Sequence, residues 1–296
     1  MKRLFSLLKL ILFIIIITIL YLYTNTNSNK EINVKYKKVD VNYKIHFIDI
    51  GQGDSTLIQS SNKNILVDTG DYNYRYKLVR YLKANNVEKI DYLFITHPHK
   101  DHMGSASHII NNFKIDKFYM PNLSNDITSY HYMIKSLNSK NININNPNIG
   151  DIYNIDDIKI EVLNVGSNNS DLNNSSLVLK ITINNINILL SSDIDGEVEK
   201  TLIDKDIKSD ILKVSHHGSK YSSTSQFLYR IKPSVSIISV GENNDYYLPH
   251  KVVLDKLEYI NSKIYRTDND GNIIIKTDGN KFEIETKKDD SNESKN

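Results

Sequence analysis

The sequence places three histidines and one aspartate directly after an apolar segment. Residues 92–95 are typical of a buried strand, and His97, His99, Asp101 and His102 follow them within seven positions. A tight turn after a strand lets such side chains converge, so that two histidines can bind one cation while Asp101 and His102 reach a second. Imidazole and carboxylate ligands suit zinc, or manganese and iron where more oxygens take part. The spacing predicts a two-metal site, although a polar loop whose histidines only cap a helix would contain the same residues.

Short apolar runs alternate with turn residues along most of the chain. Most runs have four to eight residues and are rich in Ile and Val, which indicates strands, and segments with helical spacing lie between them. We expect strands at 43–50, 55–60, 64–67, 92–96, 117–120, 159–164, 177–183, 186–191, 211–215 and 235–240, and helices at 74–85, 129–139, 197–203, 223–231 and 250–260. The pattern predicts an α/β sandwich, but on its own it allows other mixed folds.

Four motifs in series resemble the metallo-β-lactamase superfamily over about residues 43 to 282. Residues 97–102 match the HxHxDH pattern of that family in full. Asp68 ends a strand-like segment before this pattern, Asp193 ends another one after it, and a His-His-Gly-Ser run stands at 216–219. The resemblance implies an αββα sandwich of four layers, in which loops at one edge of two facing sheets carry the metal ligands.

The resemblance also implies roles for the motif residues. The implied ligands are His97 and His99 for the first ion, Asp101, His102 and His216 for the second, and Asp193 as the bridge. Asp101 and Asp193 would be catalytic, and Asp68 would hold a ligand histidine by its second ring nitrogen. We expect two divalent ions, zinc in the first place and manganese as the alternative. Such a pair lowers the pKa of a bridging water, which predicts a hydrolase.

Three positions leave alternatives open. Asn173 stands where many relatives have a third histidine for the first ion, and Asn is also common in turns. His216 and His217 compete for one ligand position because neighbouring side chains of an extended segment point to opposite faces. We favour His216 and leave His217 a supporting role. His250 either takes part in the site or only begins a helix.

Within the superfamily, the chain resembles the hydrolase domain of ComEC-type competence proteins and their stand-alone relatives. Residues 47–55, 216–219 and 264–271 carry this resemblance. Because such domains are implicated in degrading one strand of incoming DNA, it implies a phosphodiesterase or nuclease, with single-stranded DNA as one candidate substrate. Lysines beside the motifs suit phosphate as point charges, and we assign Lys220 to substrate binding. The lysines considered are Lys100, Lys213 and Lys220.

Two alternative functions remain. The substrate could be another phosphate ester, such as a cell-wall polymer or a phosphocholine group. Alternatively, the missing third histidine could leave a metal-poor binding module on the cell surface. The sequence identifies no protein partner, and a formal net charge of +2 in 296 residues argues for neither a nucleic-acid nor a membrane surface. Since the chain has no cysteine, thiolate metal sites and disulfides are excluded.

The two ends of the chain differ in composition from the rest. Residues 4–23 are almost wholly apolar and follow Lys2 and Arg3, and about 20 residues suffice for a membrane helix. We predict a single-pass membrane anchor over 1–23 and, from the positive-inside rule, an extracytoplasmic domain. Cleavage of this segment as a signal peptide would make the protein secreted. A tether at 24–41, the hydrolase domain at 42–286 and a disordered tail at 287–296 complete the predicted organisation.

Overall fold

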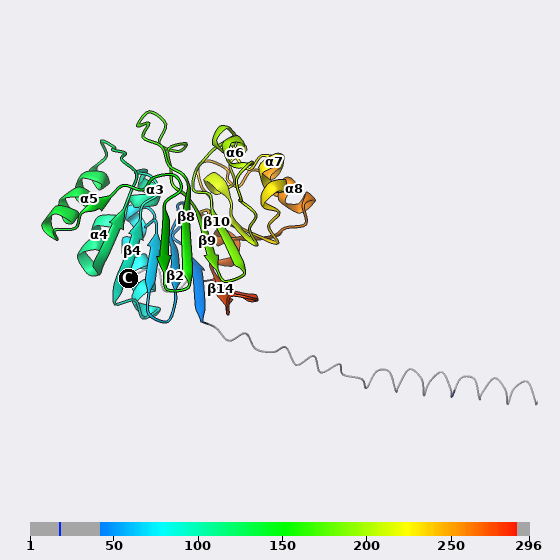
Figure 1. The fold of residues 1–296 in the computed structure, drawn as a ribbon, viewed down its shortest axis with the longest axis horizontal. Helices are drawn as coiled ribbons and strands as arrows, with labels where there is room; N and C mark the ends of the chain where they lie inside the picture. The colour runs from blue at the N-terminus through cyan, green and yellow to red at the C-terminus, as the bar shows by residue number, and fades with distance from the viewer. Residues whose placement is uncertain (1–17, 19–41, 289–296) are drawn as a thin grey trace, which may run out of the picture. The chain divides into compact units, whose positions relative to one another are not determined.

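The computed structural model describes Thr18 and residues 42–288, and the latter form an α/β domain (Figure 1). Its strands are β1 Tyr43–Phe47, β2 Thr56–Gln59, β3 Asn64–Val67, β4 Lys89–Phe94, β5 Lys114–Tyr119, β6 Ile144–Asn145, β7 Ile152–Ile155, β8 Ile158–Asn164, β9 Val178–Ile183, β10 Ile186–Leu190, β11 Ile211–Lys213, β12 Val235–Ile238, β13 Lys263–Arg266, β14 Asn272–Thr277 and β15 Phe282–Lys287. Its helices are η1 Tyr72–Tyr74, α2 Arg75–Ala84, α3 Lys100–Met103, α4 Ala106–Asn112, α5 Thr128–Ser139, α6 Gly196–Leu202, η2 Ser215–Gly218, α7 Ser225–Ile231, α8 Lys251–Tyr259 and α9 Thr267–Asp270.

The strands form two mixed sheets. One has eight strands in the order β15-β14-β1-β2-β3-β4-β5-β6, and the other has seven in the order β13-β12-β11-β10-β9-β8-β7. Strands β3 to β6 run parallel to one another, as do β10 to β13. Each sheet therefore has an edge at which several carboxyl ends of strands lie side by side.

Three apolar cores separate four layers. Residues such as Phe47, Ile181 and Ile188 fill the core between the sheets. Helices α2, α4 and α5 pack on the outer face of the eight-stranded sheet, and α6, α7 and α8 pack on the outer face of the other (Figure 1). Neighbouring strand residues enter different cores: Ile188 faces the central one and Leu189 the helices. Burial on both faces explains why these strands are continuous apolar runs in the sequence.

The two-sheet sandwich predicted from the sequence is confirmed, and the ten predicted strands and five predicted helices are all present with shifted ends. The sequence analysis missed the short elements η1, α3, α4, β6, β7, η2 and α9 and the three C-terminal strands β13 to β15. Strand β15 ends at Lys287, so the tail predicted from residue 287 begins too early, and residues 289–296 lie outside the described part.

The predicted membrane helix and tether lie outside the described residues, apart from Thr18. Within the described part of the chain, no helix has the length and apolar character needed to cross a bilayer.

Candidate metal centre

The motif residues follow the carboxyl ends of parallel strands. Asp68 follows β3 and His97 follows β4 in one sheet, whereas Asp193 follows β10 and His217 follows β11 in the other. Because the carboxyl ends of parallel neighbours lie at one edge, each sheet presents its motif residues together. The two edges meet, so residues from four distant segments share one site.

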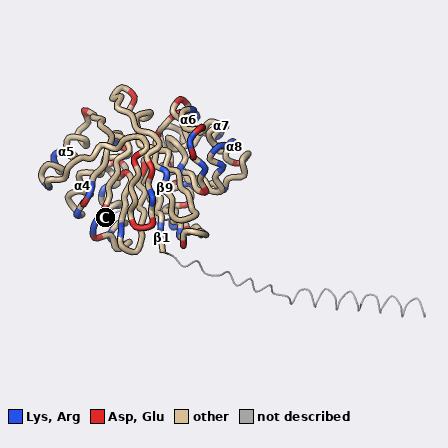
Figure 2. The backbone as a smooth tube through the Cα atoms, viewed as in Figure 1, with Lys and Arg blue, Asp and Glu red and all other residues tan. Residues whose placement is uncertain are grey.

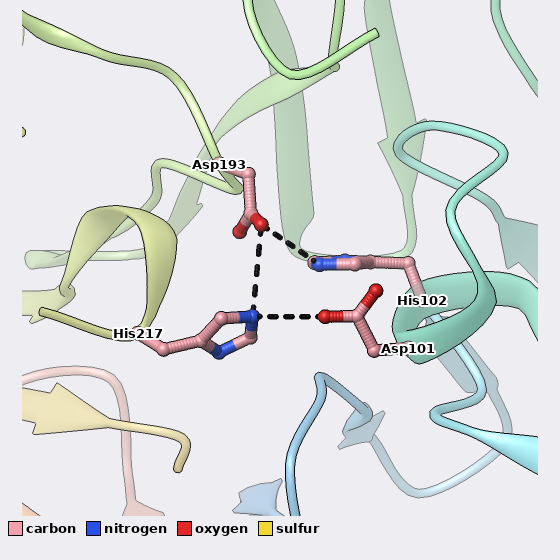
Figure 3. Close-up of side chains that lie close together, drawn as sticks. All are labelled: Asp101, His102, Asp193 and His217. Atoms are coloured by element: carbon pink, nitrogen blue, oxygen red, sulfur yellow. Dashed lines mark ion pairs between the residues drawn. The ribbon is translucent and has the colours of Figure 1, made fainter. Parts of the chain in front are cut away.

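Four side chains form the centre of this site (Figure 3). His102 Nε2 lies 3.2 Å from Asp193 Oδ2, and His217 Nε2 lies 3.6 Å from the same oxygen and 3.4 Å from Asp101 Oδ2. One ligand atom from each of the four residues lies within 4.8 Å of the others. Atoms bound tetrahedrally to one ion at about 2.1 Å lie roughly 3.4 Å apart, so these spacings suit a shared cation.

Three of these atoms are buried without a hydrogen bond. His102 Nε2, His217 Nε2 and Asp193 Oδ1 have no hydrogen-bond partner among the described residues, although both nitrogens lie in ion-pair range of the cluster carboxylates. A buried polar atom without a partner is costly, and a metal ion would satisfy all three at once. The donor set, two imidazole nitrogens and two carboxylates, is one that zinc and manganese accept. The residues present therefore fit a divalent metal ion.

Hydrogen bonds on the far side of each ring hold the two imidazoles in this orientation. His102 Nδ1 donates to Asp68 Oδ2 at 2.8 Å, and Asp68 also accepts from the backbone N–H and the hydroxyl of Thr96. His217 Nδ1 donates to the carbonyl of Ser239 at 2.8 Å. Each bond places the proton on Nδ1, which leaves Nε2 free to bind a cation.

A second pair of nitrogens lies beside the first cluster. His97 Nε2 and His99 Nδ1 face each other at 3.0 Å, and the rings of His97 and His102 have centroids 4.1 Å apart. Asn173 lines the same cleft as His99, and its Oδ1 is buried without a hydrogen-bond partner in the described structure. These three residues lie where the first of the two ions assigned in the sequence analysis would bind.

The backbone at His216 and His217 differs from the extended segment assumed for the sequence. Both residues have left-handed conformations, with φ of 49° and 52°, inside η2. The turn brings both imidazoles towards one carboxylate, because His216 Nε2 also lies 3.9 Å from Asp193 Oδ2. The premise that only one histidine can face the metals is therefore wrong. Only His217 belongs to the four-residue cluster, so the geometry favours His217 over His216 as the ligand of the second ion.

The charges of the cluster stabilise one another without a metal ion. Burial alone would lower the pKa of His102 and of His217, but Asp193 and the neighbouring carboxylates raise both. Burial alone would raise the pKa of Asp193, but His102 and His217 hold it well below its usual value. The metal-free site thus keeps protons where a cation would lie. Metal ions and protons compete for these ligands, so metal affinity should rise with pH.

Asp54 and Lys213 lie behind the cluster, and the sequence analysis did not assign Asp54 a role. Both side chains are buried, they form an ion pair, and Asp54 Oδ1 lies 3.6 Å from His217 Nδ1. Only 2% of Lys213 is exposed, so of the three lysines considered beside the motifs this one is not accessible to a substrate. The sequence signal that could have identified Asp54 is the Gly-Gln-Gly-Asp-Ser segment that contains it. A side chain at Gly53 would clash with the Asp101 carbonyl, so glycine lets this segment lie directly against the metal site.

A cleft of about 1030 Å³ opens in front of the cluster. Lys100 and Lys220 line it together with Asp101, Asn173 and His250. His250 stands at the N-cap of α8, but its Nδ1 accepts a hydrogen bond from the Lys220 N–H at 3.1 Å and does not cap the helix. It therefore supports the segment that carries Lys220.

Comparison with known proteins matches residues 48–242 to the sequence profile of the metallo-beta-lactamase superfamily. The chain belongs to the metallo-β-lactamase superfamily. By membership it is a metal-dependent hydrolase, and the fold binds divalent metal ions, commonly two. The YhfI protein of Bacillus subtilis, a metallo-β-lactamase fold protein, has a TM-score of 0.56 and 12% identity over 79% of this chain and 98% of its own. CmlA of Streptomyces venezuelae, described as a diiron β-hydroxylase, has a TM-score of 0.53 and 12% identity over 80% of this chain and 54% of its own.

Competence proteins are among the relatives of this superfamily member. The ComE operon protein 3 of Bacillus subtilis is 31% identical over 78% of this chain and 32% of its own length. Recombination protein 2 of Haemophilus influenzae is 26% identical over 82% of this chain and 30% of its own length. The chain thus spans about a third of the length of these relatives. The resemblance to competence proteins stated from the motifs is confirmed.

Proposed function

We propose that this chain is a phosphodiesterase that cleaves nucleic acid at a two-ion centre formed by the motif residues. The observation that carries the proposal is the cluster of half-buried Asp101 with buried His102, Asp193 and His217, whose ring nitrogens lack hydrogen bonds, beside a cleft of about 1030 Å³. His97, His99 and Asn173 would hold the other ion.

The residues of the site have separable tasks in this proposal. Bound ions would supply an activated water and would neutralise charge on the attacking and leaving oxygens. Asp101 is 24% exposed and faces the cleft, and His217 lowers the pKa of its carboxyl group, so the ionised carboxylate can accept a hydrogen bond from the attacking water and orient it. Lys100 and Lys220 line the cleft and would attract the phosphate as point charges.

The names of the relatives support nucleic acid as the substrate. Two are competence proteins by name or operon and one is a recombination protein, and both processes act on DNA. The buried ring nitrogens of His102 and His217 argue against the metal-poor binding module, because a protein that binds no metal gains nothing from burying two ligand atoms without hydrogen bonds.

The test uses the purified full-length chain loaded with manganese or zinc. We expect about two ions per chain and cleavage of both bis(para-nitrophenyl) phosphate and a single-stranded oligonucleotide. Asp193→Asn should abolish both reactions, whereas Asp255→Asn, at an exposed pair with Lys251, should leave them unchanged. A metal-loaded chain that cleaves neither substrate would refute the phosphodiesterase, and activity only on phosphocholine or cell-wall esters would move the substrate to that class. A chain without metal under replete conditions would support the binding module.

We also propose that the domain is held outside the cytoplasmic membrane by residues 1–23. The apolar segment that follows Lys2 and Arg3 supports this location. Fractionation of cells with protease treatment of intact spheroplasts tests it. Protection of the domain from protease, or its recovery in the cytosolic fraction, would contradict it.

A further inference from the structure

Four tyrosines from four separate segments surround the cleft. They are Tyr72 in η1, Tyr132 in α5, Tyr221 after η2 and Tyr246 before α8. Their exposed fractions are 43%, 52%, 69% and 61% in the same order. Exposed tyrosines also occur elsewhere in the domain, so exposure alone decides nothing. The informative feature is their arrangement, because rings from distant parts of the chain converge on the opening in front of one metal centre.

Cations lie against two of these rings. The Arg75 guanidinium lies 3.9 Å from the ring centroid of Tyr72, and Lys220 Nζ lies 5.3 Å from that of Tyr221. Asp71, Asp101 and Asp193 also line the cleft, but the charges next to these two rings are positive, which disfavours a quaternary ammonium group such as choline against them. The same charges attract an anion. Lys and Arg are interspersed with Asp and Glu along the described backbone (Figure 2).

We propose that these tyrosines are stacking platforms for unpaired bases, so that the cleft selects single-stranded nucleic acid. The proposal rests on the proposed phosphodiesterase function and names the residues that give it specificity. Exposed aromatic side chains beside cations suit an anionic polymer that carries flat rings. In single-stranded nucleic acid each base offers a π-face for stacking and each linkage carries a phosphate. A duplex hides its base faces in the stack, and a ringless polymer such as a polyol phosphate has none to offer.

The size of the cleft agrees with a polymer segment. At about 1030 Å³ it lies at the upper end of the range usual for single small ligands, roughly 300 to 1,000 Å³. A strand crossing it would place one phosphate over the cluster of Asp101 and Asp193 while bases on either side reach the rim. Tyr132 lies on α5 in one helical layer, and Tyr221 lies in the loop that leads into α7 of the other, so both flanks of the phosphate would have a ring.

The test measures binding without catalysis. Fluorescence anisotropy of the full-length chain in EDTA compares a labelled oligothymidine of 15 nucleotides with an abasic strand of the same length and charge and with a duplex. We expect the oligothymidine to bind most tightly. Tyr132→Ala and Tyr221→Ala should each weaken its binding by roughly 5- to 150-fold and leave binding of the abasic strand unchanged. Phenylalanine at either position should restore it, because stacking needs the ring and not the hydroxyl.

Tyr229→Ala is the matched control, since Tyr229 is 74% exposed on α7 and lies outside the cleft. Equal affinity for the oligothymidine and the abasic strand would overturn the inference, as would alanine variants that bind like Tyr229→Ala. Its failure is distinguishable from failure of the proposed function. If the wild-type protein hydrolyses bis(para-nitrophenyl) phosphate but binds both strands equally, the phosphodiesterase proposal stands and the stacking platforms are refuted. If it binds the oligothymidine selectively but hydrolyses nothing, the stacking platforms stand and the phosphodiesterase is refuted.

Discussion

Replacing Lys213 with methionine should strongly destabilise the metal-free domain, and removing the charge of Asp54 as well should restore most of the loss. Lys213 ends β11 in one sheet, whereas Asp54 lies in the loop between β1 and β2 of the other, so their buried ion pair joins the two sheets behind the metal centre. Removing one partner of a buried pair leaves an uncompensated charge and costs about 3 to 5 kcal/mol. For a domain of this size, that lowers the melting temperature by roughly 6 to 20 °C.

The double variant Asp54→Asn/Lys213→Met separates charge from packing. Neither residue is charged in this variant. Replacing a buried ion pair by uncharged groups often changes the free energy of unfolding very little. Thermal unfolding in EDTA, followed by circular dichroism, measures the stabilities of the wild type, the single variants and the double variant, which together form a double-mutant cycle. Lys180→Met is the matched control: Lys180 is also buried, but its partner Asp206 is 86% exposed, so the carboxylate left behind stays in water. The Lys180→Met substitution should lower the free energy of unfolding by about 1 kcal/mol or less. Additive losses in the double variant, or a Lys213→Met domain as stable as wild type, would refute the reasoning.

Three further outcomes follow from the described contacts. His217→Ala should lose more bound metal than His216→Ala by elemental analysis, and equal losses would contradict the assignment of His217 as the ligand. Asp68→Asn should lower metal affinity about 10- to 100-fold, because it weakens the acceptor that holds His102 Nδ1, and a competing chromogenic chelator measures this. Burial lowers the pKa of His46 to about 4. As pH falls from 6.5 towards 4, the unfolded chain therefore takes up a proton that the folded chain refuses, and stability drops by as much as about 3 kcal/mol. Urea unfolding should show a smaller loss of stability between pH 6.5 and 4 for His46→Gln than for the wild type. The same pH dependence of stability in the two proteins would rule out this role of His46.

Several parts of the fold were readable from the sequence because their signal is local. Strands buried on both faces are continuous apolar runs, and motif residues at their carboxyl ends needed no tertiary information to be recognised. The missed helix α4 is as short as the predicted helices α6 and α7, with seven residues each. Its buried face includes the small residues Ala106 and Ser107, so the adjacent pair Ile109 and Ile110 shows no helical spacing. Strand β14 was missed although Ile273, Ile274 and Ile275 gave a signal as clear as that of the predicted strands.

The sequence by itself determined the superfamily, the order of the motifs and the types of ligand atom, since these depend on residue identity and spacing. Only the tertiary structure placed His217 in the cluster, because two successive left-handed residues at 216 and 217 remove the alternation of an extended chain and turn both imidazoles towards Asp193. It also decided that Lys213 is a buried partner of Asp54, and that tyrosines far apart in the chain share one rim. Residue identity fixes what a side chain can do chemically, whereas burial, charge partners and neighbours depend on how distant segments pack together.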